Sequence, residues 1–230
     1  MNKINIAIDG FSSTGKSTVA KAIAGLLGYI YVDTGAMYRA ITYYAIKQGL
    51  VSDTHVLNQK KLVDQLPLIF LTFKINELNH ASEIYLNGVN VEKQIRSFEV
   101  NQLVSHVAKI KKVRVKLVKQ QQVMGRNKGV VMDGRDIGSV VFPRAELKLF
   151  LNASIQVRTK RRFEELKTQG QNITYEQVEA NLLKRDHIDS TREDAPLVKV
   201  PDAIEINNSN LTVDQQIEII LNLVKKFTRL

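Results

Sequence analysis

The chain of 230 residues contains no cysteine and no tryptophan, and it has only four prolines and twelve glycines. The absence of cysteine excludes disulfide frameworks and cysteine-ligated metal centres, and it suits a reducing cytoplasm. With so few prolines and glycines the chain is not of low complexity. No apolar run approaches the ~18 residues of a membrane span. The N-terminal apolar run ends at Asp9, too early for a secretory signal. We therefore expect a cytoplasmic protein without a membrane partner.

Hydrophobic residues make up 44% of the chain, which is enough for a sizeable core, while the net charge is +10 and the pI is about 9.7. An excess of positive charge serves either a nucleic-acid surface or a pocket for polyanionic nucleotides. The basic residues are spread along the sequence, and the densest short cluster is Lys160-Arg161-Arg162. Because no RNA-binding signature and no basic tail accompany them, the nucleotide pocket is the favoured interpretation.

Residues 10–17, GFSSTGKS, match the pattern G-x-x-x-x-G-K-[ST] of a phosphate-binding P-loop. An apolar run at residues 4–8 predicts a buried strand before the loop, and apolar residues at helical spacing from Val19 to Leu27 predict a helix after it. This strand–loop–helix unit directs backbone N–H groups and a positive helix end at phosphate oxygens. A glycine-rich turn with a chance lysine is the competing interpretation.

The rest of the chain alternates between expected strands and expected helices. We expect strands at residues 29–32, 129–133, 147–151 and 203–206, and helices at 36–47, 98–126 with a break near Lys111 and Lys112, 155–168, 175–189 and 213–227. This alternation predicts an α/β fold with one domain over residues 1–230: a P-loop three-layer fold in which helices flank a central parallel sheet.

Residues 52–97 do not follow this rhythm. Two short runs on either side of Asn87-Gly88 predict a β-hairpin, and an apolar run at 68–73 precedes them. We interpret the segment as a small antiparallel inserted lobe on the substrate side. An edge sheet without a role in binding is the alternative.

Polar residues follow several of the expected strands. Asp133 ends an apolar strand, as in a Walker B element, and Arg135 and Asp136 follow it beside glycines. A structural ion pair between an arginine and an aspartate is the alternative here. Residues 33–39 bring a hydroxyl and Arg39 to a strand end, where ligands bind in parallel sheets. A helix cap and an arginine on a solvated face would explain that segment equally well.

The helix expected at 155–168 carries Arg158, Arg161 and Arg162 at i, i+3 and i+4, and therefore on one face. A solvated face is the ordinary explanation for such a run. Phosphoryl transfer between two nucleotides is the other explanation, since both ligands are anions and the transferred group carries charge. Arginines at many separate loop ends favour it, namely Arg39, Arg114, Arg135, Arg158, Arg161, Arg162, Arg185 and Arg192.

Four segments together resemble the bacterial cytidylate kinase family: the P-loop, residues 33–39 (DTGAMYR), residues 133–143 (DGRDIGSVVFP) and residues 185–192 (RDHIDSTR). Their order and spacing match over nearly the whole chain, and the third segment is the most specific. The insert matches only in position and general character. The chain departs from the family at Phe11 (commonly proline), Thr34 (usually serine) and Ser17 (glycine in some members). None of the three removes a group that the implied chemistry needs.

The resemblance implies a (d)CMP kinase of pyrimidine metabolism that uses ATP with Mg²⁺ and has a helical lid at residues 154–192. It implies ATP binding by Gly10, Phe11, Ser12, Ser13, Thr14, Gly15, Lys16, Ser17 and Thr18, with Ser17 reaching Mg²⁺ through the nucleotide. Lys16 and the lid residues Arg158, Arg161 and Arg162 would be catalytic. Arg39, Arg135, Arg185 and Arg192 would hold the acceptor phosphate. Asp189 would hold the ribose hydroxyls, and Ser105, Arg114 and Asp136 would read the cytosine. Thr34 would also bind the substrate.

The implied reaction is in-line transfer of the γ-phosphoryl group to an acceptor phosphate that is already an anion, so no general base is needed. Two other functions stay open from the sequence: a kinase of another small phosphate acceptor, and a nucleotide-gated RNA-binding protein suggested by the +10 charge. We expect a monomer that binds ATP and CMP or dCMP and no nucleic acid.

Overall fold

The computed structural model describes residues 2–52, 54, 56–76 and 82–228. The chain forms two compact units. Met1–Val32 and Gln122–Leu230 make up the first, which we call the P-loop unit, and Asp33–Gln121 make up the second, which we call the inserted unit. Residues 53, 55 and 77–81 of the expected lobe lie outside the described residues.

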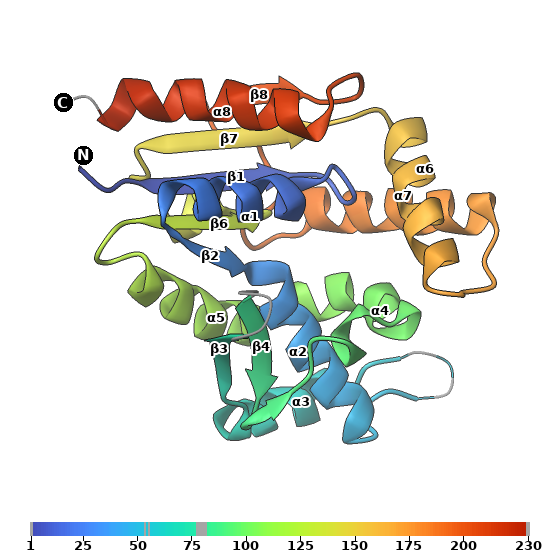
Figure 1. Ribbon diagram of the computed structural model, residues 1–230. Coiled ribbons are helices and arrows are strands. Elements are labelled where there is room, and N and C mark those ends of the chain that lie inside the picture. Colours follow the sequence, from blue (N-terminus) through green and yellow to red (C-terminus); the bar gives the residue numbers. More distant parts are fainter. Residues whose placement is uncertain (1, 53, 55, 77–81, 229–230) are drawn as a thin grey trace. The chain divides into compact units, whose positions relative to one another are not determined.

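The P-loop unit is built on a five-stranded sheet with the strand order β2-β6-β1-β7-β8 (Figure 1). The pairs β1–β6, β1–β7 and β7–β8 are parallel, which confirms the expected parallel sheet. The strands are β1 (Asn5–Gly10), β2 (Ile30–Asp33), β6 (Val130–Gly134), β7 (Leu147–Asn152) and β8 (Ile204–Asn207). Ile8 of β1 pairs with Asp133 of β6, so this register sets Asp133 beside the strand that enters the P-loop.

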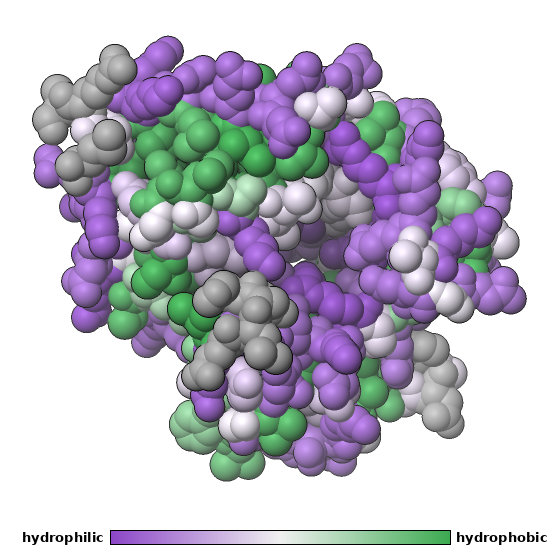
Figure 2. All heavy atoms as spheres, in the orientation of Figure 1, coloured by the Kyte–Doolittle hydropathy of each residue, from purple (hydrophilic) through white to green (hydrophobic). Residues whose placement is uncertain are grey.

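Helices flank the sheet of the P-loop unit, as expected for the fold class. They are α1 (Lys16–Leu27) and α8 (Val213–Thr228), whereas α6 (Ile155–Thr168) and α7 (Tyr175–Thr191) lie beyond the ends of the strands (Figure 1). Val19 and Ile23 of α1 share one buried core with Ile220 of α8 and Ile8 of β1, so α1 and α8 cover the same face. Figure 2 shows apolar side chains gathered over α1 and α8, whereas α6 and α7 present mostly polar ones.

The inserted unit combines helices with a three-stranded antiparallel sheet in the order β3-β4-β5. Its elements are α2 (Thr34–Lys47), α3 (Gln59–Gln65), β3 (Leu71–Ile75), β4 (Ser82–Leu86), β5 (Val89–Asn90), α4 (Phe98–Ala108) and α5 (Lys111–Met124), which ends just beyond the unit. Positive φ angles at Asn87 (49°) and Gly88 (83°) form the turn between β4 and β5, which confirms the hairpin. The expected break near Lys111 is confirmed between α4 and α5. The bounds 52–97 for a lobe and 154–192 for a lid stay predictions.

None of the described helices combines the length and the apolar character that a bilayer crossing would need. The longest, α7, has 17 residues and is charged along much of its length.

Asp9, near the end of β1, ties that strand to a π-helical turn at Ile137–Val141, which follows β6. Its carboxylate accepts hydrogen bonds from the backbone N of Ile137 (2.8 Å) and of Gly138 (2.7 Å). Burial disfavours the charged carboxylate more than these two donors favour it, and it raises the pKa of Asp9 to about 6. The segment that carries Arg135 and Asp136 is therefore anchored by a group that titrates near neutral pH.

We expect the free energy of unfolding to change with pH as Asp9 ionises. Its pKa rises from 3.8 to about 6 on folding, so its contribution is full below pH 3.8 and is lost as the pH rises through 6. Relative to Asp9→Asn, which does not titrate, the wild type should lose up to about 3 kcal/mol between pH 4 and pH 7. Urea unfolding of both proteins across this range measures it. Parallel pH profiles of unfolding free energy in the two proteins would contradict the raised pKa of Asp9.

Candidate functional site

The P-loop backbone has three residues with positive φ, and two of them are glycines. Gly10 (φ 147°), Ser13 (φ 58°) and Gly15 (φ 83°) all have positive φ. A Cβ atom at Gly10 would lie 2.0 Å from the carbonyl oxygen of Leu151 on the neighbouring strand, so this position cannot carry a side chain without moving β7. Gly15 is the N-cap of α1, and no side chain caps this helix. The first N–H groups of α1 are thus available to a ligand at the loop.

The side chain of Lys16 turns back into the P-loop. Its Nζ donates hydrogen bonds to the backbone oxygen of Phe11 (2.5 Å) and to Thr14 Oγ1 (3.2 Å). Burial, together with the positive charge of Arg135, holds the pKa of Lys16 well below its usual value. An incoming phosphate would reverse that effect, because an anion at the loop favours the charged ammonium.

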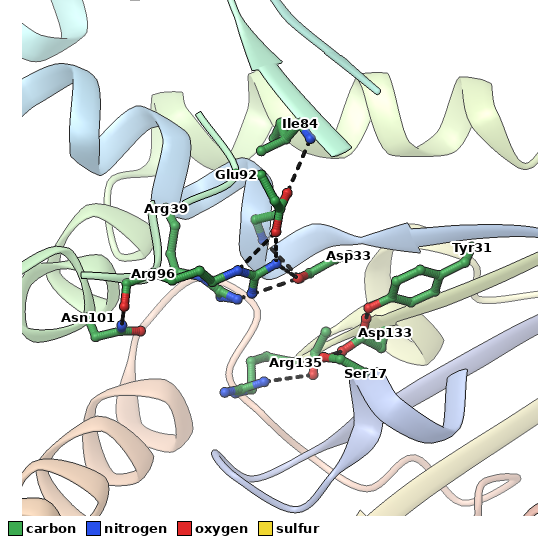
Figure 3. A network of polar contacts seen from close by, with 12 residues as sticks. Ser17, Tyr31, Asp33, Arg39, Ile84, Glu92, Arg96, Asn101, Asp133 and Arg135 are labelled. Atoms are coloured by element: carbon green, nitrogen blue, oxygen red, sulfur yellow. Dashed lines mark hydrogen bonds and ion pairs between the residues drawn. The ribbon is translucent and has the colours of Figure 1, made fainter. Parts of the chain in front are cut away.

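Ser17, at the start of α1, points toward Asp133 at the end of β6 (Figure 3). Its hydroxyl donates to Asp133 Oδ2 at 2.9 Å, and the hydroxyl of Tyr31 donates to Asp133 Oδ1 at 3.0 Å. A hydroxyl and a carboxylate at these two places are the P-loop and Walker B oxygens that fit Mg²⁺. The described residues contain no cluster of three or more metal-ligating side chains, so an ion here would take its other ligands from phosphate and water.

Ser12 joins the P-loop to two arginines. Its side-chain Oγ accepts from Arg135 Nη2 at 3.0 Å, and its backbone oxygen accepts from Arg158 Nη1 at 3.2 Å. Its backbone N donates to Asp186 Oδ1 at 3.0 Å, and Asp186 also forms an ion pair with Arg158. Two guanidinium groups therefore reach a loop built for phosphates, and a buried carboxylate holds one of them there.

The three arginines of α6 have different surroundings. The side chain of Arg158 is 8% exposed and also donates to the backbone oxygen of Ala153 at 3.0 Å. Arg161 donates to the side-chain oxygen (3.2 Å) and the backbone oxygen (3.0 Å) of Asn208, whose own Nδ2 donates to the backbone oxygen of Thr14 at 2.7 Å. The alternative of a solvated face is therefore wrong for Arg158 and Arg161. Arg162 pairs with the exposed Glu165 on its own helix at 2.7 Å, but its own side chain is 15% exposed, so it does not lie on a solvated face either.

A second set of charges in the P-loop unit joins the loop after β6 to the end of α7. Arg135 Nε donates to Asp189 Oδ2 at 3.0 Å, so this arginine forms an ion pair with a carboxylate of α7. Arg192 lies 3.8 Å from Asp136 and 3.9 Å from Asp189. Four of the expected substrate-binding residues are thus brought together, and Arg185 lies on α7 one turn before Asp189.

The other four expected substrate-binding residues belong to the inserted unit. Thr34 is the first residue of α2 and is buried, Arg39 lies on the same helix, and Ser105 is buried on α4. Arg114 is buried on α5, where its Nη1 donates to the hydroxyl of Tyr38 on α2 at 3.5 Å.

Asp33 is the N-cap of α2 and accepts from the backbone N of Ala36 at 2.8 Å, so the capping interpretation is confirmed. The same carboxylate pairs with Arg39 at 3.5 Å and with Arg96 at 2.9 Å. Burial alone would raise the pKa of Asp33, but the charges of the two arginines lower it. The side chain of Arg39 is 13% exposed, so an arginine on a solvated face is wrong.

Sequence reasoning missed the groups that hold these arginines. Asp186 lies inside the segment 185–192 that carried the resemblance, and an acidic residue one position after an arginine was the available signal. Asn208 contacts Thr14 across 194 residues, and Arg96 contacts Asp33 across 63. No local pattern marks such distant pairs.

The different surroundings of the α6 arginines predict different costs of removal. Arg158→Ala leaves the carboxylate of Asp186 buried without its partner, which should lower the free energy of unfolding by about 3 kcal/mol. Arg162→Ala breaks a pair with Glu165, which is 53% exposed, and should cost less than about 1 kcal/mol. Urea unfolding at one pH compares the two variants. Equal losses of unfolding free energy in the two variants would contradict a stabilising role of the buried pair between Arg158 and Asp186.

Known proteins resemble this chain along nearly its whole length. A family model described as cytidylate kinase matches residues 6–226. A cytidylate kinase of Flavobacterium psychrophilum is 56% identical over 224 residues, covering 97% of this chain and 99% of its own. A cytidylate kinase of Flavobacterium johnsoniae is 54% identical over 230 residues and covers 100% of both chains. The crystal structure of an uncharacterized protein from Eubacterium ventriosum shares the fold, with a TM-score of 0.50 at 13% identity over 98% of this chain and 99% of that one. The chain belongs to the cytidylate kinase family.

Proposed function

We propose that this protein is a (d)CMP kinase, which transfers the γ-phosphoryl group of ATP to CMP or dCMP and yields ADP with CDP or dCDP. The observation that carries the proposal is the attachment of Arg135 and Arg158 to Ser12 of the P-loop, at 3.0 Å and 3.2 Å. Phosphoryl transfer needs positive groups placed around a phosphate loop before the reaction begins. The choice of CMP or dCMP as acceptor rests on membership of the family.

On the donor side, residues 10–18 would bind the phosphates of ATP through backbone N–H groups. Lys16 would exchange the oxygens of Phe11 and Thr14 for phosphate oxygens, and it would stabilise charge on the transferred group. Ser17 and Asp133 would hold Mg²⁺ that enters with the nucleotide. When bound, this ion neutralises charge on the phosphates.

On the acceptor side, four arginines would hold the phosphate of CMP, and Thr34 would contact the same substrate. The arginines are Arg39, Arg135, Arg185 and Arg192. Asp189 would accept hydrogen bonds from the ribose hydroxyls. The support within the P-loop unit is that Arg135, Asp189 and Arg192 already lie together.

The cytosine base would be recognised by Ser105, Arg114 and Asp136. Cytosine offers an amino group at N4 beside acceptors at N3 and O2. An ionised Asp136 accepts from that amino group, and Arg114 donates to the acceptors. Uracil has an oxygen at C4 and a proton on N3. It would therefore place an acceptor against the carboxylate of Asp136 and a donor against the guanidinium of Arg114. Buried groups left unpaired penalise the wrong base more than a missing contact would.

Catalysis would rest on position and charge alone. The acceptor phosphate is an anion near neutral pH, so no residue has to remove a proton from it. Arg158, Arg161 and Arg162 would stabilise the charge that builds on the equatorial oxygens, and closure of the α6–α7 segment would exclude water. We further propose that the protein works as a monomer in the cytoplasm, independently of nucleic acid.

A substrate panel tests the proposed activity. ADP formation from ATP and Mg²⁺ is measured with CMP, dCMP, UMP, AMP and GMP in turn. We expect kcat/KM for CMP or dCMP to exceed the values for the other acceptors by about a hundredfold or more, because the base site rejects the wrong hydrogen-bond pattern. Lys16→Ala is the control, and its turnover should fall by about a hundredfold. A preference for AMP or GMP, or ADP formation that needs no acceptor, would contradict the proposal.

A further inference from the structure

Asn208 is a buried residue directly after β8, and its side chain contacts three elements of the P-loop unit. Its Nδ2 donates to the backbone oxygen of Thr14 in the P-loop at 2.7 Å and to Gln216 Oε1 on α8 at 2.7 Å. Its Oδ1 accepts from Arg161 Nη1 on α6 at 3.2 Å. Both N–H groups and the oxygen of one amide are therefore in use, and the activity proposed above gives Asn208 no role.

The neighbours of Asn208 fix the orientation of its amide. A guanidinium has donors only, so the amide atom that faces Arg161 must be the oxygen. The nitrogen then faces Thr14 and Gln216, and both of these offer it an oxygen. Gln216 is held in turn, because its Nε2 donates to two backbone oxygens just before α8, at 3.3 Å and 3.2 Å. An aspartate at residue 208 could still accept from Arg161, but it would set an oxygen against two other oxygens.

The contact with Thr14 sets the direction of an N–H group in the P-loop. The peptide bond between Thr14 and Gly15 is planar and trans, so the N–H of Gly15 points away from the oxygen that Asn208 contacts. Gly15 is the N-cap of α1 and lies at the positive end of that helix. The hydroxyl of Thr14 stays inside the loop, where it donates to the backbone oxygen of Phe11 at 3.1 Å. Asn208 therefore orients the N–H of Gly15 without contacting it.

Arg161 is held by the same residue through two oxygens that carry no net charge. Its Nη2 donates to the backbone oxygen of Asn208 at 3.0 Å, next to the contact that Nη1 makes with the side chain. Burial lowers the pKa of Arg161, but a guanidinium stays protonated in proteins. Arg158, by contrast, pairs with the carboxylate of Asp186. The amide of Asn208 thus fixes Arg161 without neutralising it.

We propose that Asn208 is a positioning residue for the phosphates of ATP, which aligns the Thr14–Gly15 peptide of the P-loop with Arg161 of α6 through one amide. The inference rests on the proposed function, in which the P-loop binds these phosphates and Arg161 stabilises charge on the transferred group. The contact with Thr14 serves the binding of ATP through the N–H of Gly15. The contact with Arg161 serves the transition state through a positive charge held in place.

The first test is Asn208→Ala, with Asn210→Ala as the matched control, because Asn210 is an exposed asparagine in the same loop. We expect the calorimetric Kd for ATP with Mg²⁺ to rise about tenfold, because the N–H of Gly15 is no longer held in one direction. We also expect kcat to fall about tenfold, because Arg161 loses its side-chain partner. The KM for CMP should stay within about twofold. Asn210→Ala should change none of these constants.

A double-mutant cycle with Arg161→Ala separates the two contacts. Where Arg161 is already absent, Asn208→Ala should lower kcat by less than about twofold more, and it should still raise the Kd for ATP about tenfold. Losses of kcat that multiply in the double variant would overturn the proposal. An unchanged Kd for ATP in Asn208→Ala would overturn it as well.

Gln216→Ala tests whether Asn208 only stabilises the packing of α8. This variant removes one partner of the amide but leaves Thr14 and Arg161 in contact with it. The free energy of unfolding, measured in urea, should fall because a buried N–H group loses its acceptor. The Kd for ATP and kcat should change by less than about twofold. Changes in both constants as large as those in Asn208→Ala would assign the effect to stability and overturn the positioning role.

Asn208→Asp keeps the test decisive if Asn208→Ala does not fold, because it preserves the size of the side chain and an oxygen for Arg161. Its carboxylate would oppose the oxygens of Thr14 and Gln216 and would neutralise Arg161, so the Kd for ATP and kcat should change at least as much as in Asn208→Ala. Wild-type protein without CMP-dependent turnover would reject the proposed function itself, while calorimetry with ATP, which needs no acceptor, would still test the contact with Thr14. Normal wild-type turnover with unaltered Kd and kcat in the Asn208 variants would reject only the role of Asn208.

Discussion

Two polyanionic nucleotides repel each other, and a protein that joins them must hold positive groups in place without neutralising them. In this chain, buried carboxylates hold the arginines. Asp186 holds Arg158 beside the P-loop, Asp189 holds Arg135, and Asp33 holds Arg39 and Arg96 in the inserted unit. A guanidinium has five N–H donors, so one carboxylate can fix it and still leave donors for a phosphate. Because these carboxylates are buried, removing an arginine partner would leave a buried charge uncompensated, which makes each pair costly to break.

Several of the carboxylates at the site lie at or near the ends of strands. Asp33 ends β2, Asp133 lies near the end of β6, and Asp9 near the end of β1 anchors the turn that follows Arg135 and Asp136. In a parallel sheet such ends share one edge. The glycine at residue 10 lets β1 leave the sheet against Leu151 and form the P-loop. The apolar core under α1 and α8 therefore serves function indirectly, since it fixes the strand register that aligns these carboxylates.

The sequence alone was enough for the elements whose signals are local. The P-loop, the strand ending at Asp133, the Asn87-Gly88 turn and the break between α4 and α5 all follow from patterns of a few residues, and all are confirmed. The partners of the arginines were not predictable in this way. Three arginines on one helical face gave a single pattern, yet Arg158 is buried against Asp186, Arg161 contacts Asn208 and Arg162 pairs within its helix. Those differences arise from residues 28 to 47 positions away or from the next turn, and helical periodicity contains no information about them.

The central claim is that the carboxylates position the arginines rather than merely balance their charge, and Asp33→Asn tests it most directly. Asparagine caps a helix as well as aspartate does, so α2 should keep its start. The substitution removes one negative charge beside Arg39. If the carboxylate only balanced charge, its loss would tighten the binding of CMP. If it holds Arg39 and Arg96 in place, its loss weakens binding, and we expect the calorimetric Kd for CMP to rise about tenfold. An unchanged or lower Kd in the folded variant would contradict the account.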